Sequence, residues 1–105
     1  MPLSFSIVIP TYNEAAGIAK LIEALDATFR SNSLDGEIIV VDDNSPDRTG
    51  AVVDALAARF PVRCLHRSGK LGLSSAVIDG WGIARPESVA LGAMDADFSH
   101  DVSAL

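Results

Sequence analysis

Glu-Ile-Ile-Val-Val at residues 37–41, followed at once by Asp-Asp-Asn-Ser-Pro-Asp at residues 42–47, is the stretch that decides the fold. The first part is a continuous, largely β-branched run, and such runs are typical of strands that are covered on both faces. The second part is rich in residues that form turns, so the strand is expected to end there. A strand covered on both faces predicts a parallel sheet with helices on each side.

The sequence on either side alternates further apolar runs with amphipathic helical patterns. Strands are predicted at Phe5–Ile9, Val62–Leu65 and Val89–Met94, and helices are predicted where apolar residues recur at helical spacing between the strands. Thr49 is expected to cap the second helix, and Trp81 is expected in the core beneath the third. The resulting β-α-β-α-β-α-β order predicts the α/β class, with a Rossmann-like parallel sheet, flanking helices and right-handed crossovers.

The composition is that of an ordinary globular domain in which acidic residues outnumber basic ones. The chain has 105 residues, which suits one domain, and a net charge of −6. That charge argues against a nucleic-acid partner, which needs a basic surface. The single cysteine, Cys64, cannot form an internal disulfide and is expected to be a small buried strand residue in a reduced, cytosolic setting. No signal peptide is expected, because the first residues, Met1-Pro2-Leu3-Ser4, form neither a basic nor an apolar segment, and no apolar run approaches the ~20 residues that a membrane span needs.

Four polar segments follow the predicted strands, at residues 10–14, 42–47, 66–72 and 95–97. Ligands of parallel α/β sheets gather outside the carboxyl ends of the strands, so these segments are expected to form one site. Asp95 and Asp97 flank one small residue after an apolar strand. Two carboxylates offer the hard oxygen ligands that Mg²⁺ or Mn²⁺ prefers, usually together with substrate phosphates. The alternative is an ordinary turn or helix N-terminal pair.

The third segment is basic, and residues 59–70 contain no acidic residue. Arg67 and Lys70 stand beside glycines before a predicted helix, an arrangement that suits a pyrophosphate. The alternative is a solvated surface segment. The spacing differs from that of a P-loop, and no G-x-G-x-x-G follows the first strand, so neither of these phosphate-binding motifs is present.

The first two segments supply further acceptors. Asp42 and Asp43 can accept hydrogen bonds from a nucleobase or a ribose, Tyr12 can lie against either group, and Glu14 can accept from a hydroxyl. Turn chemistry is the alternative explanation for Asp43, and helix capping is the alternative for Glu14.

Four blocks, IVIPTYNE, IIVVDDNSPDRT, RSGKLGLSSAVIDGW and MDADFSHD, together resemble the N-terminal half of family 2 glycosyltransferases with the GT-A fold. Within that family they are most similar to the dolichol-phosphate and polyprenol-phosphate mannosyltransferases. The resemblance covers essentially the whole chain. PTYNE and the D-x-D occur widely in the family, whereas the DDNSPDRT, GLSSAV and MDADFSH blocks are more specific to the polyprenyl-phosphate branch.

The resemblance implies a role for each matching residue. Nucleotide-sugar contacts are implied for Pro10, Tyr12, Glu14, Asp42, Asp43, Arg67, Lys70 and the backbone of Ala96. Asp95 and Asp97 would hold the metal, Mg²⁺ or Mn²⁺, on the diphosphate and so carry catalysis. Ser99 stands where some relatives carry a glutamine as a further metal-site residue.

The reaction implied by the resemblance is an inverting transfer of mannose from GDP-mannose to a polyprenyl (dolichyl) phosphate. The divalent ion and basic groups would stabilise the charge on the departing diphosphate. The acceptor is already an anion, because the second pKa of a phosphate monoester is about 6. The alternatives are a family 2 transferase that uses a UDP-sugar, and a non-catalytic fragment that binds nucleotide sugars.

The resemblance also implies a cytoplasmic protein that is peripheral at the cytosolic membrane face. The fold of the family has a second half with acceptor contacts, and the sequence ends at Leu105, soon after the D-x-D. Residues 1–105 are therefore expected to be a nucleotide-sugar-binding domain truncated at its C-terminus and inactive alone. Homo-oligomers are a further expectation, because an isolated half would expose apolar surface.

Overall fold

A computed structural model describes residues 3–68, 73–84 and 90–93. The elements along the chain are β1 (Leu3–Thr11), α1 (Ala15–Ser31), β2 (Leu34–Asp42), α2 (Thr49–Leu56), β3 (Val62–His66), α3 (Leu73–Gly82) and β4 (Ala90–Ala93). The four strands pair in parallel in the order β3-β2-β1-β4. The predicted α/β fold, a parallel sheet with flanking helices, is confirmed.

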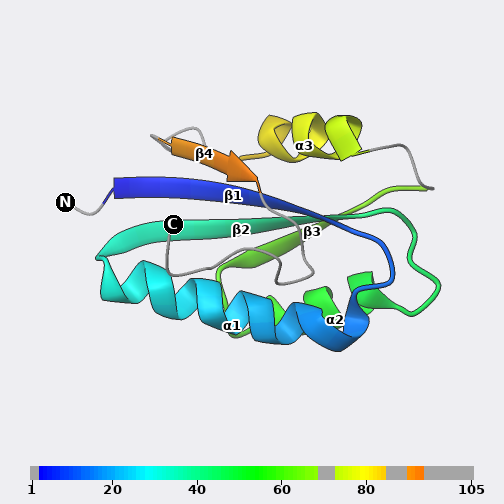
Figure 1. The fold of residues 1–105 in the computed structure, drawn as a ribbon, viewed down its shortest axis with the longest axis horizontal. Coiled ribbons are helices and arrows are strands. Elements are labelled where there is room, and N and C mark those ends of the chain that lie inside the picture. The colour runs from blue at the N-terminus through cyan, green and yellow to red at the C-terminus, as the bar shows by residue number, and fades with distance from the viewer. Residues whose placement is uncertain (1–2, 69–72, 85–89, 94–105) are drawn as a thin grey trace.

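Helices cover both faces of the sheet (Figure 1), with α1 and α2 on one side and α3 on the other. Alternate residues of β2 point to opposite faces of the sheet. Ile38 and Val40 pack in the layer that contains α1, and Ile39 and Val41 pack in the layer that contains α3. All four are fully buried. This two-sided burial is the reason for the uninterrupted apolar run at residues 37–41.

Helix α1 buries the apolar stripe that its sequence predicts. Five residues at helical spacing are at most 2% exposed, namely Ile18, Leu21, Ile22, Leu25 and Phe29. They pack on the strand residues of the same layer, which include Ile7 and Ile9 of β1. The stripe therefore fixes which face of α1 lies on the sheet.

Two local expectations are wrong. Thr49 is the first residue of α2, and Arg48, in the left-handed region with φ 68°, occupies the N-cap position. Trp81 is 40% exposed and not in the core. Small residues of α3 face the sheet instead: Ala76 packs with Val8, Ile39 and Val41, and at Gly80 an added Cβ would lie 2.5 Å from the Cγ1 atom of Val8. The helix approaches the sheet too closely there for a large side chain.

The strand order creates a switch point beside β1. The chain runs from β1 outward to β2 and β3, and then returns to place β4 on the other side of β1. In open parallel sheets, ligands bind in the crevice outside the carboxyl ends of the two strands at such a point. Here those ends are Thr11 of β1 and Ala93 of β4.

No helix among the described residues has both the length and the apolar character needed to cross a membrane.

Candidate functional site

Hydrogen bonds join the loop after β1 to the loop after β2 and to the first residue of α2. The backbone N–H of Asn13 donates to the Ser45 hydroxyl at 2.9 Å, and the N–H of Glu14 donates to the Thr49 hydroxyl at 2.9 Å. The N–H of Ala15 donates to the Asp47 carboxylate at 3.0 Å. The N-cap residue of α1, Glu14, makes no side-chain capping hydrogen bond. The second loop therefore satisfies N–H groups at the start of a helix more than thirty residues earlier in the chain.

Asp42 lies at the centre of this connection and is 3% exposed. Its carboxylate accepts hydrogen bonds from the Thr11 hydroxyl at 2.7 Å, from the Ser45 hydroxyl at 2.6 Å and from the Ser45 N–H at 3.0 Å. Asp42 thus joins the ends of β1 and β2 to the loop that follows β2. Its predicted contact with a base or ribose stays a prediction.

Asp43 and Arg67 form a buried bidentate ion pair. The Nε and Nη2 atoms of Arg67 donate to the two carboxylate oxygens of Asp43 at 2.6 and 3.0 Å. The Nη1 atom donates to Ser75 at 2.8 Å and to Asp79 at 3.0 Å, both on α3. The Arg67 side chain is 4% exposed, and hydrogen bonding to Asp43 raises the pKa of its guanidinium. Arg67, directly after β3, therefore links Asp43, directly after β2, to helix α3. Its predicted role near the phosphates stays a prediction.

The other predicted nucleotide contacts in the described residues lie at the same edge of the sheet. Pro10 is half-buried in β1 and pairs with Val41 of β2. Tyr12 is 40% exposed just beyond the end of β1. Glu14 is half-buried at the N-cap position of α1, where its carbonyl accepts the first helical hydrogen bonds. The structure thus brings the β1 and β2 segments together, whereas Lys70, Asp95, Ala96, Asp97 and Ser99 lie outside the described residues.

A cavity of about 240 Å³ opens beside this network between the end of β2, the start of α2 and the end of β3. Its lining comprises Asp42, Asn44, Ser45, Arg48, Gly50, Ala51, Asp54, His66 and Arg67. Most of these residues were not among the predicted site residues. For Asn44, Ser45 and Arg48 the signal in the sequence is the DNSPDRT block, whose residue types are equally typical of a turn.

Asp47 accepts three hydrogen bonds at the start of the two helices on this side of the sheet. It accepts from the hydroxyl and the N–H of Thr49 as well as from the N–H of Ala15. The bond from the Thr49 hydroxyl, followed by the two backbone bonds, holds the pKa of Asp47 below its ordinary value of 3.8. Asp47 is therefore favoured as a carboxylate in the folded chain.

Replacing Asp47 by alanine is expected to lower the thermal midpoint of unfolding, because these donors lose their acceptor. A lowered folded-state pKa stabilises the fold above the ordinary pKa of 3.8, and this stabilisation disappears as pH falls through the folded pKa. The difference in midpoint between Asp47→Ala and the unmodified chain should thus be full at neutral pH and should shrink in acid. Thermal unfolding followed by circular dichroism measures it, and a difference that does not change with pH would contradict the role of the charge.

Comparison with known sequences identifies the chain's relatives. The sequence profile of glycosyl transferase family 2 matches residues 6–105. A dolichol-phosphate mannosyltransferase of Pyrococcus furiosus is 40% identical over 98 residues. The aligned region covers 93% of this chain but only 27% of that relative. The chain thus spans less than a third of the length of this curated protein.

Solved structures of glycosyltransferases share the fold. S. aureus TarS 1-349 superimposes with a TM-score of 0.76 at 24% identity, over 90% of this chain and 28% of that structure. The mannosyltransferase PcManGT from Pyrobaculum calidifontis, solved in complex with GDP-Man and Mn²⁺, gives a TM-score of 0.65 at 22% identity. That match covers 81% of this chain and 25% of PcManGT. The predicted GT-A type of fold is therefore confirmed.

Proposed function

The chain belongs to glycosyl transferase family 2, and from that premise we propose that it forms the donor-binding half of an inverting mannosyltransferase. The donor is GDP-mannose, and the acceptor is a polyprenyl phosphate such as dolichyl phosphate. The observation that carries this proposal is the place of β4 beside β1, which brings the chain to the switch point of the sheet immediately before Asp95-Ala96-Asp97.

Relatives support the choice of donor and acceptor. The Pyrococcus furiosus relative is a dolichol-phosphate mannosyltransferase, and its match extends over nearly the whole of this chain. PcManGT, which shares the fold, was solved with GDP-Man and Mn²⁺. Both similarities support mannose as the donor sugar, and the similarity to PcManGT also supports a guanine nucleotide and a divalent metal.

The chemistry of the predicted donor set fits a divalent ion. Asp95 and Asp97 provide carboxylate oxygens, which Mg²⁺ and Mn²⁺ both accept, and Ser99 adds a hydroxyl to the same segment. In the described part of the switch-point edge, the carboxylates of Asp42 and Asp43 are already engaged by Thr11, Ser45 and Arg67. We therefore assign the ion to the D-x-D. The ion supplies positive charge where the diphosphate leaves.

The remaining residues position the donor. Tyr12 presents an exposed ring at the end of β1, where a base or ribose can lie against it. Pro10, Glu14 and Asp42 lie at the same edge of the sheet and border the nucleotide, and Lys70 and the backbone of Ala96 complete the nucleotide contacts. A polyprenyl phosphate carries its own negative charge, so the acceptor can attack without a strong base on this chain. Since such acceptors are membrane lipids, the reaction belongs at the cytosolic membrane face.

Substitutions in the D-x-D test the metal assignment. We expect Mn²⁺ to tighten GDP-mannose binding by at least about tenfold, because the ion neutralises diphosphate charge that the acidic chain repels. Asp95→Asn and Asp97→Asn should each abolish this gain while leaving the weak metal-independent binding. Isothermal titration calorimetry with and without Mn²⁺ measures both quantities.

Glu23→Gln is the matched control, because Glu23 is an exposed carboxylate on α1. The Glu23→Gln variant should show the same gain in GDP-mannose affinity on adding Mn²⁺ as the unmodified chain. If both D-x-D variants also keep that response, the ion binds elsewhere and the assignment is wrong.

A further inference from the structure

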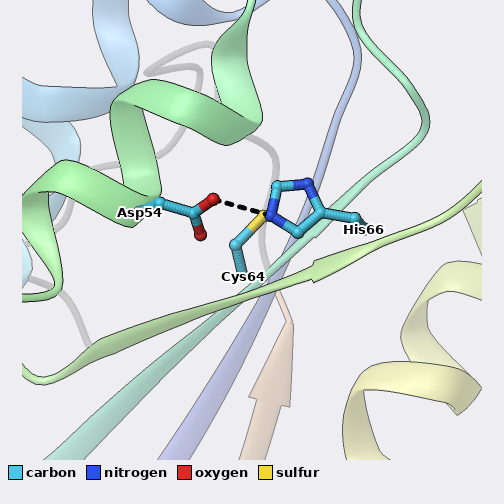
Figure 2. A group of neighbouring side chains, drawn as sticks. All are labelled: Asp54, Cys64 and His66. Carbon is cyan, nitrogen blue, oxygen red and sulfur yellow. Dashed lines mark hydrogen bonds and ion pairs between the residues drawn. The ribbon is translucent and has the colours of Figure 1, made fainter.

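Three side chains with different metal-binding atoms converge outside the D-x-D segment. Asp54 comes from α2, and Cys64 and His66 come from β3 (Figure 2). Their nearest oxygen, sulfur and nitrogen atoms all lie within 4.8 Å of one another. The Nε2 atom of His66 is 2.9 Å from the Oδ2 atom of Asp54. Asp54 and His66 also line the cavity beside Asp42.

The fold itself produces this convergence. Cys64 and His66 are two residues apart on one strand, so their side chains leave the same face of the sheet. Cys64 packs with the layer that contains α1 and α2, which places both side chains under α2. Gly50, one turn before Asp54 on α2, leaves room for the imidazole, since a Cβ there would lie 2.7 Å from the Cε1 atom of His66. The glycine thus allows the ring to lie between α2 and β3.

The three donors match one class of ion. Zn²⁺ binds thiolate sulfur, imidazole nitrogen and carboxylate oxygen, whereas Mg²⁺ prefers oxygen alone. A tetrahedral ion with bonds of about 2.0–2.3 Å holds its ligand atoms roughly 3.3–3.8 Å apart. This spacing falls between the 2.9 Å contact of His66 with Asp54 and the 4.8 Å that bounds the whole group. Small side-chain movements are therefore enough to admit the ion.

Local charge also favours a cation. The carboxylates of Asp54 and Asp42 border the same cavity and attract a divalent cation, which replaces the thiol proton of Cys64 when it binds. Half-burial of Cys64 limits competition from water at the sulfur.

We propose that Asp54, Cys64 and His66 form a binding site for Zn²⁺, with water as the fourth ligand. The carboxylate of Asp54, the Sγ atom of Cys64 and the Nε2 atom of His66 coordinate the ion, and the thiol proton passes to solvent. This ion is separate from the one that the D-x-D is proposed to hold. It bridges α2 to β3 and borders the cavity at the end of β2.

Cobalt(II) is the probe for this site, because its thiolate complexes absorb in the near ultraviolet and the chain has a single cysteine. Adding Co²⁺ to the chain should produce the charge-transfer band at one equivalent, and Zn²⁺ should abolish it. His66→Gln and Asp54→Asn should each weaken Co²⁺ binding by at least about tenfold, since even indirect partners of a metal change its affinity by that much. Absence of the band, or unchanged affinity in both variants, would overturn the proposal.

Two controls keep this site distinct from the donor site. The double variant Asp95→Asn/Asp97→Asn should retain the cobalt band, and Mg²⁺ in excess should not displace the ion. Loss of the band in that variant would mean that the thiolate and the D-x-D share one metal, which contradicts two separate sites. Circular dichroism confirms that each variant is folded.

A measurement on the unmodified chain needs no substitution. Zn²⁺ should slow alkylation of Cys64 by iodoacetamide at least about tenfold, because the metal occupies the thiolate that reacts. Mg²⁺ should leave the rate unchanged. Equal alkylation rates with and without Zn²⁺ would overturn the proposal, whatever the behaviour of the variants.

Discussion

Replacing Arg67 by methionine is expected to lower the free energy of unfolding by about 3 kcal/mol, the lower end of the range for removing one partner of a buried ion pair. The Arg67 side chain is 4% exposed and hydrogen-bonds Asp43, Ser75 and Asp79. Methionine fills much of the same space but leaves the Asp43 carboxylate, itself 8% exposed at the residue level, without its cation. Urea denaturation followed by circular dichroism measures the change.

Arg30→Met is the matched control for this substitution. Arg30 also pairs with a carboxylate, that of Asp26 at 3.1 Å, but its side chain is 76% exposed on α1. The Asp26 side chain is 12% exposed, but the Arg30 guanidinium lies in water and makes one contact with it, so the pair is screened by solvent. Pairs at this helical spacing contribute about 0.3–0.5 kcal/mol, and the control should change stability little. Equal effects of the two substitutions would contradict the structural role assigned to Arg67.

A pair of identical glycine substitutions in α3 is expected to have opposite effects. Gly80→Ala should destabilise the chain by about 2 kcal/mol, because inserted core volume forces neighbouring groups to move. The added Cβ would lie 2.5 Å from a methyl group of Val8 and 3.1 Å from one of Val41. Both neighbours are fully buried, so they have little space to shift.

Gly82→Ala is the comparison, because no heavy atom lies within 4 Å of a Cβ added at Gly82. Alanine there should be neutral or stabilising by up to about 1 kcal/mol through its higher helix propensity. Thermal and urea unfolding of both variants measure the difference. Destabilisation of similar size at both positions would show that close packing of α3 on the sheet is not the cause.

The layers of the fold were predictable because each depends on a local pattern. The run at residues 37–41 predicts a strand covered on both faces, and the stripe from Ile18 to Phe29 predicts the buried side of α1. Trp81 was placed in the core by the same kind of pattern, and that prediction is wrong. Helical spacing indicates a face but not the distance to the sheet, and at Gly80 that distance excludes a large side chain.

The partners of the predicted polar residues could not be read from the sequence, because they lie far apart in it. Asp43 and Arg67 were each predicted to contact a nucleotide, yet they pair with each other across 24 positions. Asp47 caps a helix that begins 32 residues earlier. Such pairs arise only when parallel strands bring their carboxyl ends to one edge. The roles predicted for Asp95, Asp97 and Lys70 remain predictions.

The central claim is that this edge binds a guanine nucleotide with a divalent metal, and calorimetry of GDP and UDP, each with and without Mn²⁺, tests it most directly. We predict that the chain binds GDP more tightly than UDP and that Mn²⁺ strengthens GDP binding by at least about tenfold. Tighter binding of UDP would contradict the mannosyltransferase proposal in favour of a UDP-sugar donor. A folded chain that binds neither nucleotide would contradict the donor site itself.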